Sequence, residues 1–565
     1  MASVTKKVKK GKTYYYVTQC RRVNGKPRVV WQKYLGTVDR IVERMNATDP
    51  ATPKETVLFE AGGVAALLRI AEGLGLIELI DGIAPKRNQG PSVGHYMVLA
   101  ALNRALAPCS KVEIGQWYES TILRRLWGFK KKAFSSQRFW DHMDRIDQEH
   151  INQVQDRLVA RIGEEFGVDT DVLLFDTTNF FTFIASTNER NDLAQRGRNK
   201  QKRNDLRQVG LSLIASRTFQ VPLLHGMYEG NLNDLTVFPG VVRDLSRRYS
   251  ELIRRDTPVT LVCDKGCMGQ EAIEQLAGDG VHFVCGLPST YFEEIFTTPV
   301  GELSPLEGLP GTKGLSFPVE LWSKDCQVVL CHSESLRTQQ IDSITRQMVG
   351  CEKKLSALQT SLQERARGGT PGRKPTVDSV RRRVRKILSR QYMSEVIKTK
   401  VTGKKGKIPT LHYEIDDEGL TRLRTTRLGR TLLVTDRLQW EPEEVVRTYR
   451  GLARIEDAFK NMKNTDYLRW QPSWHWTNQK LRVHGFYCVL ALTLVRLARK
   501  VAWEAGEELS VGKLLDELTG IKEVALIYPE GYKKRGEGRL SHSRMSPQQL
   551  RLAKALDIGK VMAWG

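Results

Sequence analysis

Apolar residues recur along this chain with two different periods. Between about Ala61 and Ile162 they recur every three or four residues, as in GGVAALLRIAEGLGLIELI and HYMVLAALNRAL, which predicts a helical region. Before this region, residues 13–36 alternate between apolar and polar around Asn24-Gly25, a pattern typical of a β-hairpin. After it, from residue 172, short apolar runs bounded by polar residues predict strands.

These strand signals follow one another in a definite order. The predicted strands are Val172–Asp176, Val209–Ser216, Val221–Tyr228, Val259–Asp264 and 281–287, and the predicted helices are Leu235–Ser250 and a helix beginning near Gly269. The order strand, strand, strand, helix, strand, helix, strand is similar to the ribonuclease-H-like arrangement. In that mixed α/β fold the first and fourth strands are neighbours, flanked by helices.

The pattern breaks after Pro288. Residues 288–430 combine Gly/Pro-rich segments, an amphipathic helix and short strand-like pieces, which favours a long insertion. The core resumes with TLLVTD at 431–436 and a helix beginning near Glu443. The expected domains are an N-terminal β-hairpin arm (1–60), a helical domain (61–165), a core in two parts (166–287 and 431–505), the insertion domain (288–430) and a C-terminal helical region (506–565).

Charge narrows the range of partners. Lys and Arg number 88 against 64 Asp and Glu, a formal net charge of +24 with an isoelectric point near 9.6. Such a surplus favours polyanions, because each neutralised phosphate releases condensed counterions. Residues Arg365–Lys407 alone hold fifteen Lys and Arg and two acids. This run indicates either solvated surface or a nucleic-acid contact. The helical region 61–165 indicates either a DNA-binding domain or a plain helical core.

Cysteine spacing and hydropathy argue against a zinc site, a secreted protein and a membrane protein. The nine Cys are scattered without zinc-site spacing, which predicts free thiols in a reducing compartment. The N-terminus lacks an apolar signal core, and the longest apolar stretch, Phe486–Val495, is too short to span a bilayer. We therefore expect a soluble cytoplasmic protein without a membrane partner.

Three carboxylates are the strongest candidates for chemistry. Asp176 ends LLFD, Asp264 ends VTLVCD, and Glu456 lies in the helical run YRGLARIEDAFKNMK. Each strand-end Asp alone could be a turn residue or a helix cap, but neighbouring first and fourth strands would bring the two together. With Glu456 they would form an oxygen-rich pocket able to hold two Mg²⁺ (or Mn²⁺) ions, the arrangement that stabilises both the attacking and the leaving oxygen of a phosphodiester.

Glu456 is the best-specified of the three. Seven helical residues turn through about 700°, so Tyr449, Glu456 and Lys463 form one stripe, with Lys460 beside it. This stripe suits a phosphate backbone next to a metal. The alternative is an exposed face on which Glu456 pairs with Lys460.

Other polar and aromatic residues have weaker claims. Asp457 points about 100° away from the stripe, and Asp436, at a strand end, is a rival third ligand. His475 and His484 favour structural hydrogen bonding. Three tryptophans favour packing over stacking on a base: Trp470, Trp474 and Trp476.

The residues carry a family resemblance. The chain resembles the DDE transposases of bacterial insertion sequences, in the branch marked by a Y-x2-R-x3-E-x6-K helix, which Tyr449, Glu456 and Lys463 match. Leu452 occupies the Arg position, which is a departure from the branch and leaves open whether the phosphate contact assigned to that Arg is made here. Three further stretches are similar to the branch: GRNKQKRNDLRQVGLSL, HGMYEGNLNDLT and LRWQPSWHWTNQKLRVHGFYCVLAL.

The resemblance implies a function and a set of roles. Asp176, Asp264 and Glu456 would be the catalytic metal ligands for hydrolysis at the element's ends and then transfer of the 3′-OH to target DNA. Double-stranded DNA would be the partner, a homodimer would form on it, and residues 61–165 would bind the ends. The phosphate-contacting residues would be Tyr449, Lys460, Lys463, Arg198, Lys200, Lys202 and Arg203. The alternatives are a ribonuclease-H-fold nuclease without strand transfer and an inactive DNA-binding derivative.

Overall fold

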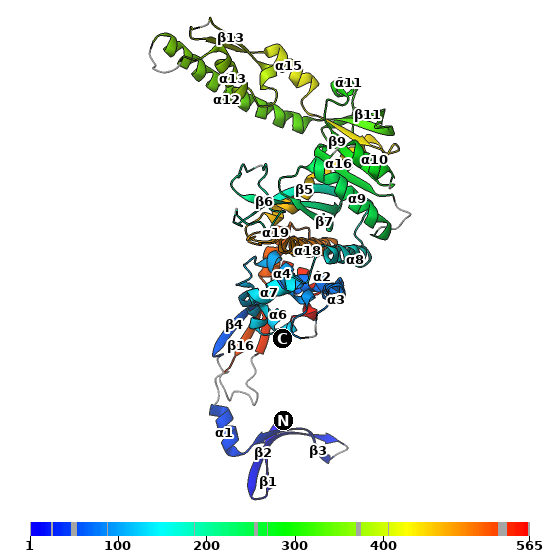
Figure 1. The fold of residues 1–565 in the computed structure, drawn as a ribbon. Coiled ribbons are helices and arrows are strands. Elements are labelled where there is room, and N and C mark those ends of the chain that lie inside the picture. Colours follow the sequence, from blue (N-terminus) through cyan, green and yellow to red (C-terminus); the bar gives the residue numbers. More distant parts are fainter. Residues whose placement is uncertain are drawn as a thin grey trace.

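A computed structural model describes most of the chain (Figure 1). The described residues are 2–23, 26–46, 53–86, 89–185, 187–199, 201–252, 258–267, 269–278, 280–368, 374–404, 406–528 and 539–562. The expected turn at Asn24-Gly25 and the expected DNA contact Lys200 lie outside these ranges.

A nine-stranded mixed sheet forms the centre of the structure, in the order β10-β11-β12-β15-β9-β8-β5-β6-β7. Its strands are β5 (Val172–Thr182), β6 (Arg207–Ser216), β7 (Pro222–Glu229), β8 (Thr260–Cys263), β9 (His282–Leu287), β10 (Ser304–Pro305), β11 (Thr312–Leu321), β12 (Lys324–Ser333) and β15 (Arg430–Thr435). The predicted adjacency of the first and fourth strands is confirmed, since β5 and β8 pair in parallel. β6 and β7 add antiparallel on one side, and β9 adds parallel to β8. The order is consistent with the expected ribonuclease-H-like arrangement.

Helices contact this sheet and hold the candidate residues over it. α9 (Asp234–Leu252) and α10 (Gln270–Gly278) follow β7 and β8 and pack against each other. α16 (Pro442–Arg450) contacts β8, β9 and β15, and α17 (Ala453–Met462) contacts β5. The two helices that follow β15 therefore lie over the strands that carry the aspartates.

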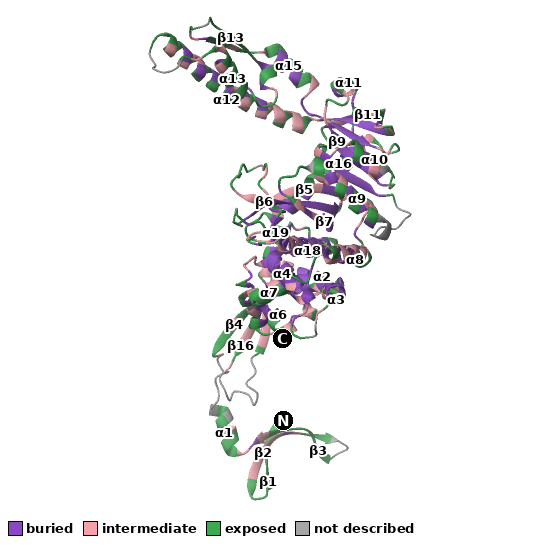
Figure 2. Cartoon of the chain, in the orientation of Figure 1, coloured by how far each residue is buried: buried purple, intermediate pink, exposed green. Residues whose placement is uncertain are grey.

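A long buried helix joins the sheet to the helical region. α18 (Asn478–Glu504) contacts α4 and α2 on one side and β7 on the other, and Figure 2 shows it as largely buried. The surrounding helices are α2 (Gly62–Gly73), α3 (Leu76–Ile83), α4 (Val93–Leu106), α5 (Ile114–Glu119), α6 (Leu123–Trp127), α7 (Ser136–Met143) and α8 (Gln148–Phe166), with the short helix η1 (Lys131–Phe134). Among the described residues α18 alone is long and apolar enough to cross a membrane, but 94% of its apolar window is buried inside the protein. It is longer than the expected apolar stretch, and its burial is that of a core helix.

The expected insertion of residues 288–430 divides into two parts. Its first part holds α11 (Glu293–Thr297), η3 (Val300–Glu302) and β10–β12, and these strands extend the central sheet through β12 and β15. The second part has a hydrophobic core of its own. It contains α12 (Glu334–Ala366), α13 (Val377–Ile387), α14 (Met393–Val396), β13 (Ile397–Thr402), β14 (Thr410–Ile415) and α15 (Asp417–Thr426). The inserted domain is therefore shorter than expected.

The two ends of the chain contribute further strands. β1 (Ala2–Lys9), β2 (Lys12–Val23) and β3 (Lys26–Gly36) form an antiparallel sheet followed by α1 (Val38–Asn46). β4 (Glu55–Glu60) pairs with β16 (Lys522–Ile527), which also pairs with β17 (Arg539–His542). The remaining C-terminal helices are α19 (Val511–Thr519), α20 (Pro547–Ala555) and η4 (Ile558–Lys560). Residues 506–565, expected to be helical, thus also contain strands that pair with the N-terminal part.

Candidate active site

Asp176 lies inside β5, not at its end as the sequence analysis expects. β5 pairs with β8 only as far as Leu174, whereas its pairing with β6 continues to Thr182. The strand is therefore longer than its apolar part, because β6 supplies hydrogen bonds beyond the point where β8 stops. The Asp176 carboxylate Oδ1 accepts a hydrogen bond of 2.7 Å from the backbone N–H of Thr177, and the residue is partly exposed.

Asp264 directly follows β8, as predicted. Its Oδ1 accepts hydrogen bonds from the backbone N–H of Lys265 at 2.8 Å and from the Tyr449 hydroxyl at 3.0 Å. Burial, followed by the negative charge of Asp264, raises the pKa of the Tyr449 hydroxyl well above its ordinary value. Tyr449 therefore stays protonated and acts as a donor that orients the carboxylate.

Gly286 on β9 makes this contact possible. A Cβ at Gly286 would lie 2.7 Å from the Tyr449 hydroxyl oxygen, closer than any ordinary contact. A side chain at this position would push the tyrosine ring away from the aspartate.

The predicted single helix around Glu456 is two helices. Between α16 and α17 the backbone N–H groups of Leu452, Arg454 and Ile455 bond to carbonyls three residues earlier. This tightened turn replaces the four-residue spacing of an α-helix. Leu452, at the Arg position of the motif, is 9% exposed and lies in the hydrophobic core. The break therefore turns an apolar residue inward at the position where the related branch carries a cation.

Glu456 and two lysines of the predicted stripe reach the same cavity. Glu456 is exposed on α17 and is not buried among apolar neighbours. Lys463, which caps α17, donates a 2.5 Å hydrogen bond to Thr178 Oγ1 and lies over the ring of Phe180. Lys460 pairs with Asp457 at 3.0 Å, so the predicted pair with Glu456 is not the contact that forms.

One cavity of about 480 Å³ brings these residues together. It is lined by Asp176, Thr177, Thr178, Asn179, Asn199, Gln201, Asp264, Glu456, Phe459, Lys460 and Lys463. Asp176, Asp264 and Glu456 therefore line the same cavity. The two lysines supply positive charge beside the three carboxylates.

The donor chemistry of this cavity suits a hard cation. Carboxylate, hydroxyl and amide oxygens line it, and these are the ligands that Mg²⁺ prefers. Throughout the described ranges, however, no three His, Cys, Asp or Glu side chains are grouped closely enough to hold an ion where they stand. Like charges disfavour close approach, so the carboxylates share a cavity without forming a tight cluster. The expected metal-site spacing is not reached in this structure.

Among its described residues, the basic loop after β5 lines the cavity with amides and not with cations. Asn199 and Gln201 line the cavity, whereas Arg198, Lys202 and Arg203 are not among its lining residues. Arg203 is engaged by Asp205 through two hydrogen bonds of 2.8 and 2.7 Å. The charged residues of this loop were the predicted contacts, and the two amides were not predicted because no motif marks them.

Asp436, the rival third ligand, has a structural role. Its side chain is 4% exposed and accepts hydrogen bonds from the backbone N–H of Phe283 and from His282, and it pairs with Lys324 at 2.8 Å. His282 begins β9, whereas Cys285 pairs with Cys263, the residue just before Asp264. Asp436 therefore lies toward the opposite end of these strands from the candidate cavity.

The two histidines and Trp470 are buried, whereas the other two candidate tryptophans are exposed. His475 and His484 are 4% and 0% exposed and join through a 2.8 Å hydrogen bond, as the structural interpretation predicts. Trp470 is buried and stacks on Phe180 with ring centroids 4.2 Å apart. Trp474 and Trp476, in contrast, are 53% and 55% exposed.

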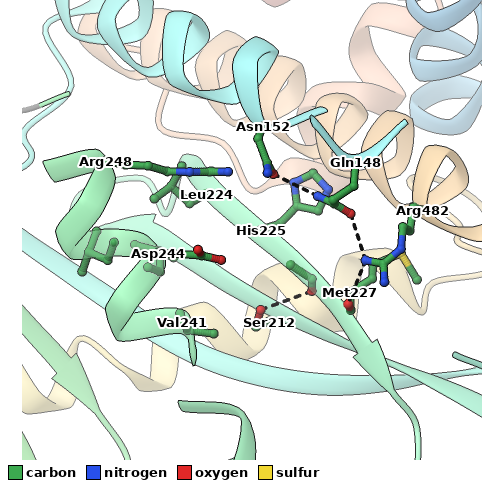
Figure 3. Close-up of a pocket in the computed structure, with 13 residues that line it drawn as sticks. Gln148, Asn152, Ser212, Leu224, His225, Met227, Val241, Asp244, Arg248 and Arg482 are labelled. Carbon is green, nitrogen blue, oxygen red and sulfur yellow. Dashed lines mark hydrogen bonds between the residues drawn. The ribbon is translucent and has the colours of Figure 1, made fainter. Parts of the chain in front are cut away.

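A separate cavity of about 200 Å³ lies between α8, α9 and strands β6 and β7 (Figure 3). Arg482 donates to Gln148 Oε1 at 2.9 Å, and Arg248 lies 3.3 Å from Asp156. Burial lowers the pKa of His225, which lines this cavity, to about 3. The three candidate carboxylates are not among its lining residues. It is therefore distinct from the candidate active site.

The Tyr449–Asp264 contact yields a first prediction. Tyr449→Phe removes the donor that orients Asp264 and retains the ring, so it is expected to weaken binding of a divalent cation in this cavity about 10–100-fold, the usual effect of losing such a supporting hydrogen bond. A Mg²⁺ titration followed by calorimetry measures the effect. Thr465→Val is the matched control, since the Thr465 hydroxyl is exposed and donates to its neighbour Asp466 instead of to a candidate carboxylate. A Tyr449→Phe curve that superimposes on the unaltered one contradicts the assignment.

Comparison with known proteins gives little guidance. No protein-family model and no curated protein matches the sequence. Among solved structures, the chain is similar to a piggyBac transposase in a synaptic complex with hairpin DNA, at 9% sequence identity and a TM-score of 0.36. The alignment covers 80% of this chain and 79% of that chain. A likeness this weak identifies neither the family nor the activity.

Proposed function

We propose that this chain is a DDE-type DNA transposase whose active site is the cavity lined by Asp176, Asp264 and Glu456. The observation that carries the proposal is the meeting of these three carboxylates, from two adjacent parallel strands and one helix, in a cavity that also holds two lysines. Asp176 and Glu456 are 280 positions apart in the sequence, yet both line this cavity, as the transposase resemblance predicts.

The chain's residues would divide the work of phosphoryl transfer. Asp176, Asp264 and Glu456 would hold two Mg²⁺ or Mn²⁺ ions, which supply charge neutralisation at the attacking and leaving oxygens. The proposal requires these carboxylates to draw closer together than they stand. Tyr449 would keep Asp264 oriented toward the cavity, and the Lys463 ammonium would neutralise a nearby backbone phosphate.

Two successive reactions would use this one site. Water attacks the phosphodiester at the end of the element, the P–O3′ bond breaks, and a 3′-OH is released. That 3′-OH then attacks a target phosphodiester, so one P–O bond forms as another breaks without outside energy. Both reactions need in-line positioning of the attacking oxygen more than covalent help from the protein.

Positive charge supports DNA as the substrate. The formal net charge is +24, and α13 buries only Val380 and Val384 while its arginines face solvent. Synapsis of two element ends would require two copies of the chain, so we propose a homodimer on DNA. Residues 61–165 would bind the ends and the basic loop, including Arg198, Lys202 and Arg203, would contact phosphates. We further propose a cytoplasmic location.

Leu452 favours a second candidate, a nuclease or an inactive DNA-binding derivative. Leucine at this position supplies no cation, whereas the branch that the sequence resembles has an arginine there. An exposed arginine on the same helix, Arg454, lines a neighbouring cavity instead.

One experiment separates these candidates. The purified chain is incubated with Mg²⁺, a supercoiled plasmid and a duplex carrying the DNA that borders its gene. Nicked duplex together with duplex–plasmid joints is the result we expect. Nicks without joints would favour the nuclease, and binding without nicks would favour the inactive derivative.

A further inference from the structure

A second cavity borders the candidate active site across α17. It has a volume of about 670 Å³ and is walled by α17, α18 and the turn between β6 and β7. Lys460 lines both this cavity and the carboxylate cavity, so the two cavities adjoin at that side chain. Glu456 and Lys460 are one helical turn apart, about 6 Å along the axis, so the two cavities lie within a few nucleotides of one strand.

The cavity is rich in positive charge that the protein does not neutralise. Arg454, Lys460, Arg496 and Arg499 line it, against the single acid Asp457. Arg496 is 3% exposed, and its Nε and Nη2 have no hydrogen-bond partner. Its Nη1 makes only a long contact of 3.4 Å with Gln220 Oε1. A buried guanidinium with unpaired donors is costly unless an anion satisfies it, so the cavity favours an anionic ligand.

Aromatic rings add a second recognition element. Phe219 and Trp503 meet edge to face with centroids 6.1 Å apart, and the Arg499 guanidinium lies 5.8 Å from the first ring and 5.2 Å from the second. Trp503 is 37% exposed although it is large and apolar. Phe219 and Gln220 both adopt positive φ, 62° and 51°, which non-glycine residues rarely do. The turn thus holds a ring at the cavity at a cost in backbone strain.

We propose that this cavity binds a single DNA strand as it leaves the active site. Backbone phosphates would pair with Arg454 and Arg496, and an unstacked base would pack on Trp503. Proteins that bind single-stranded nucleic acid combine basic side chains along the phosphate backbone with aromatic rings on which bases stack. The inference rests on the proposed function for the identity of the strand, whereas binding itself requires no cleavage.

The test measures binding of labelled oligo(dT), and of the matching dA·dT duplex, to the full-length chain by fluorescence anisotropy in EDTA. Trp503→Ala is expected to weaken single-strand binding about tenfold, and Trp503→Phe to stay within about twofold of the unaltered chain, because a phenyl ring still stacks. Arg454→Gln, at an exposed position, is expected to weaken binding. It is also expected to lower the slope of log affinity against log salt concentration by about one, because one phosphate contact is lost. Thermal unfolding confirms that each variant is folded.

The outcomes separate this inference from the proposed function. Asp176→Asn is expected to bind oligo(dT) normally whether or not the chain cleaves DNA. Ultraviolet crosslinking of iododeoxyuridine oligonucleotide, mapped by mass spectrometry, should place the base on the peptide that contains Trp503. Unchanged binding by both Trp503→Ala and Arg454→Gln would overturn the inference. Equal weakening of single-strand and duplex binding by Trp503→Ala would also overturn it, because base stacking requires an unpaired strand.

Discussion

Asp176→Asn is expected to lower Mg²⁺-dependent DNA nicking by roughly a thousandfold or more, since losing a metal-ligating charge removes several kcal/mol of transition-state stabilisation. Asparagine keeps the shape of the side chain and can still accept the hydrogen bond from the Thr177 N–H. DNA binding should therefore stay within about twofold of the unaltered chain, as phosphate contacts supply most of that affinity. Single-turnover nicking and a filter-binding assay measure the two quantities.

Asp171→Asn is the matched control for this change. Asp171 precedes the same strand, is exposed, and lies at the end of β5 where Val172 pairs with Thr260. The same substitution there should leave nicking near its original rate. Full nicking by Asp176→Asn, or equal losses in both variants, would contradict the role given to Asp176.

Acidification below about pH 6.5 is expected to destabilise the fold, and two buried histidines in contact, His475 and His484, contribute up to about 2.7 kcal/mol per pH unit to this loss. His484 Nε2 lies 2.8 Å from the Trp470 carbonyl, so it is the donor, and His484 Nδ1 accepts from His475. Burial lowers the pKa of both rings well below the ordinary value. Their surroundings add positive charge, since Lys111 and Arg104 lower both pKa values further.

The sign follows from proton uptake. Above about pH 6.5 both rings are neutral in the folded and unfolded chain, and the full stability is present. Below it the unfolded chain takes up protons that the folded chain excludes, so stability falls with pH until the folded pKa values are reached. Urea unfolding between pH 7.5 and 5 measures this slope.

Variants assign the slope to particular rings. His475→Asn should reduce it by up to about 1.4 kcal/mol per pH unit, the share of one titrating group. His412→Asn is the control, because His412 is exposed on β14. A slope that His475→Asn leaves unchanged would show that other groups control the acid response.

The central strands could be predicted because their sequence signals are local. Apolar runs such as Val209–Ser216 and Val221–Tyr228 match β6 and β7 within a few residues. Their order along the chain then fixes which strands can be neighbours, and the pairing of β5 with β8 follows that order. The placement of Asp176 and Asp264 on neighbouring strands follows from the same reasoning, whereas Glu456 was a candidate from its helical stripe and the family resemblance.

Other features depend on contacts that no local pattern encodes. β5 extends beyond Asp176 because β6 pairs with it there. β12 joins the central sheet because its apolar run Val328–Cys331 pairs with β15, about a hundred residues later in the sequence. The break between α16 and α17 coincides with the burial of Leu452 in the core, a contact that the helical period alone does not predict. Lys460 pairs with Asp457, three residues away, and not with Glu456, four residues away, which was the partner in the alternative interpretation of the stripe.

Anomalous scattering from a crystal grown with Mn²⁺ and cleaved DNA tests the central claim most directly. The account predicts two peaks about 3.5–4 Å apart between the carboxylates of Asp176, Asp264 and Glu456, with Glu456 drawn toward the two aspartates. Peaks bound elsewhere, or a cavity that holds DNA with no ion between these three side chains, would contradict it.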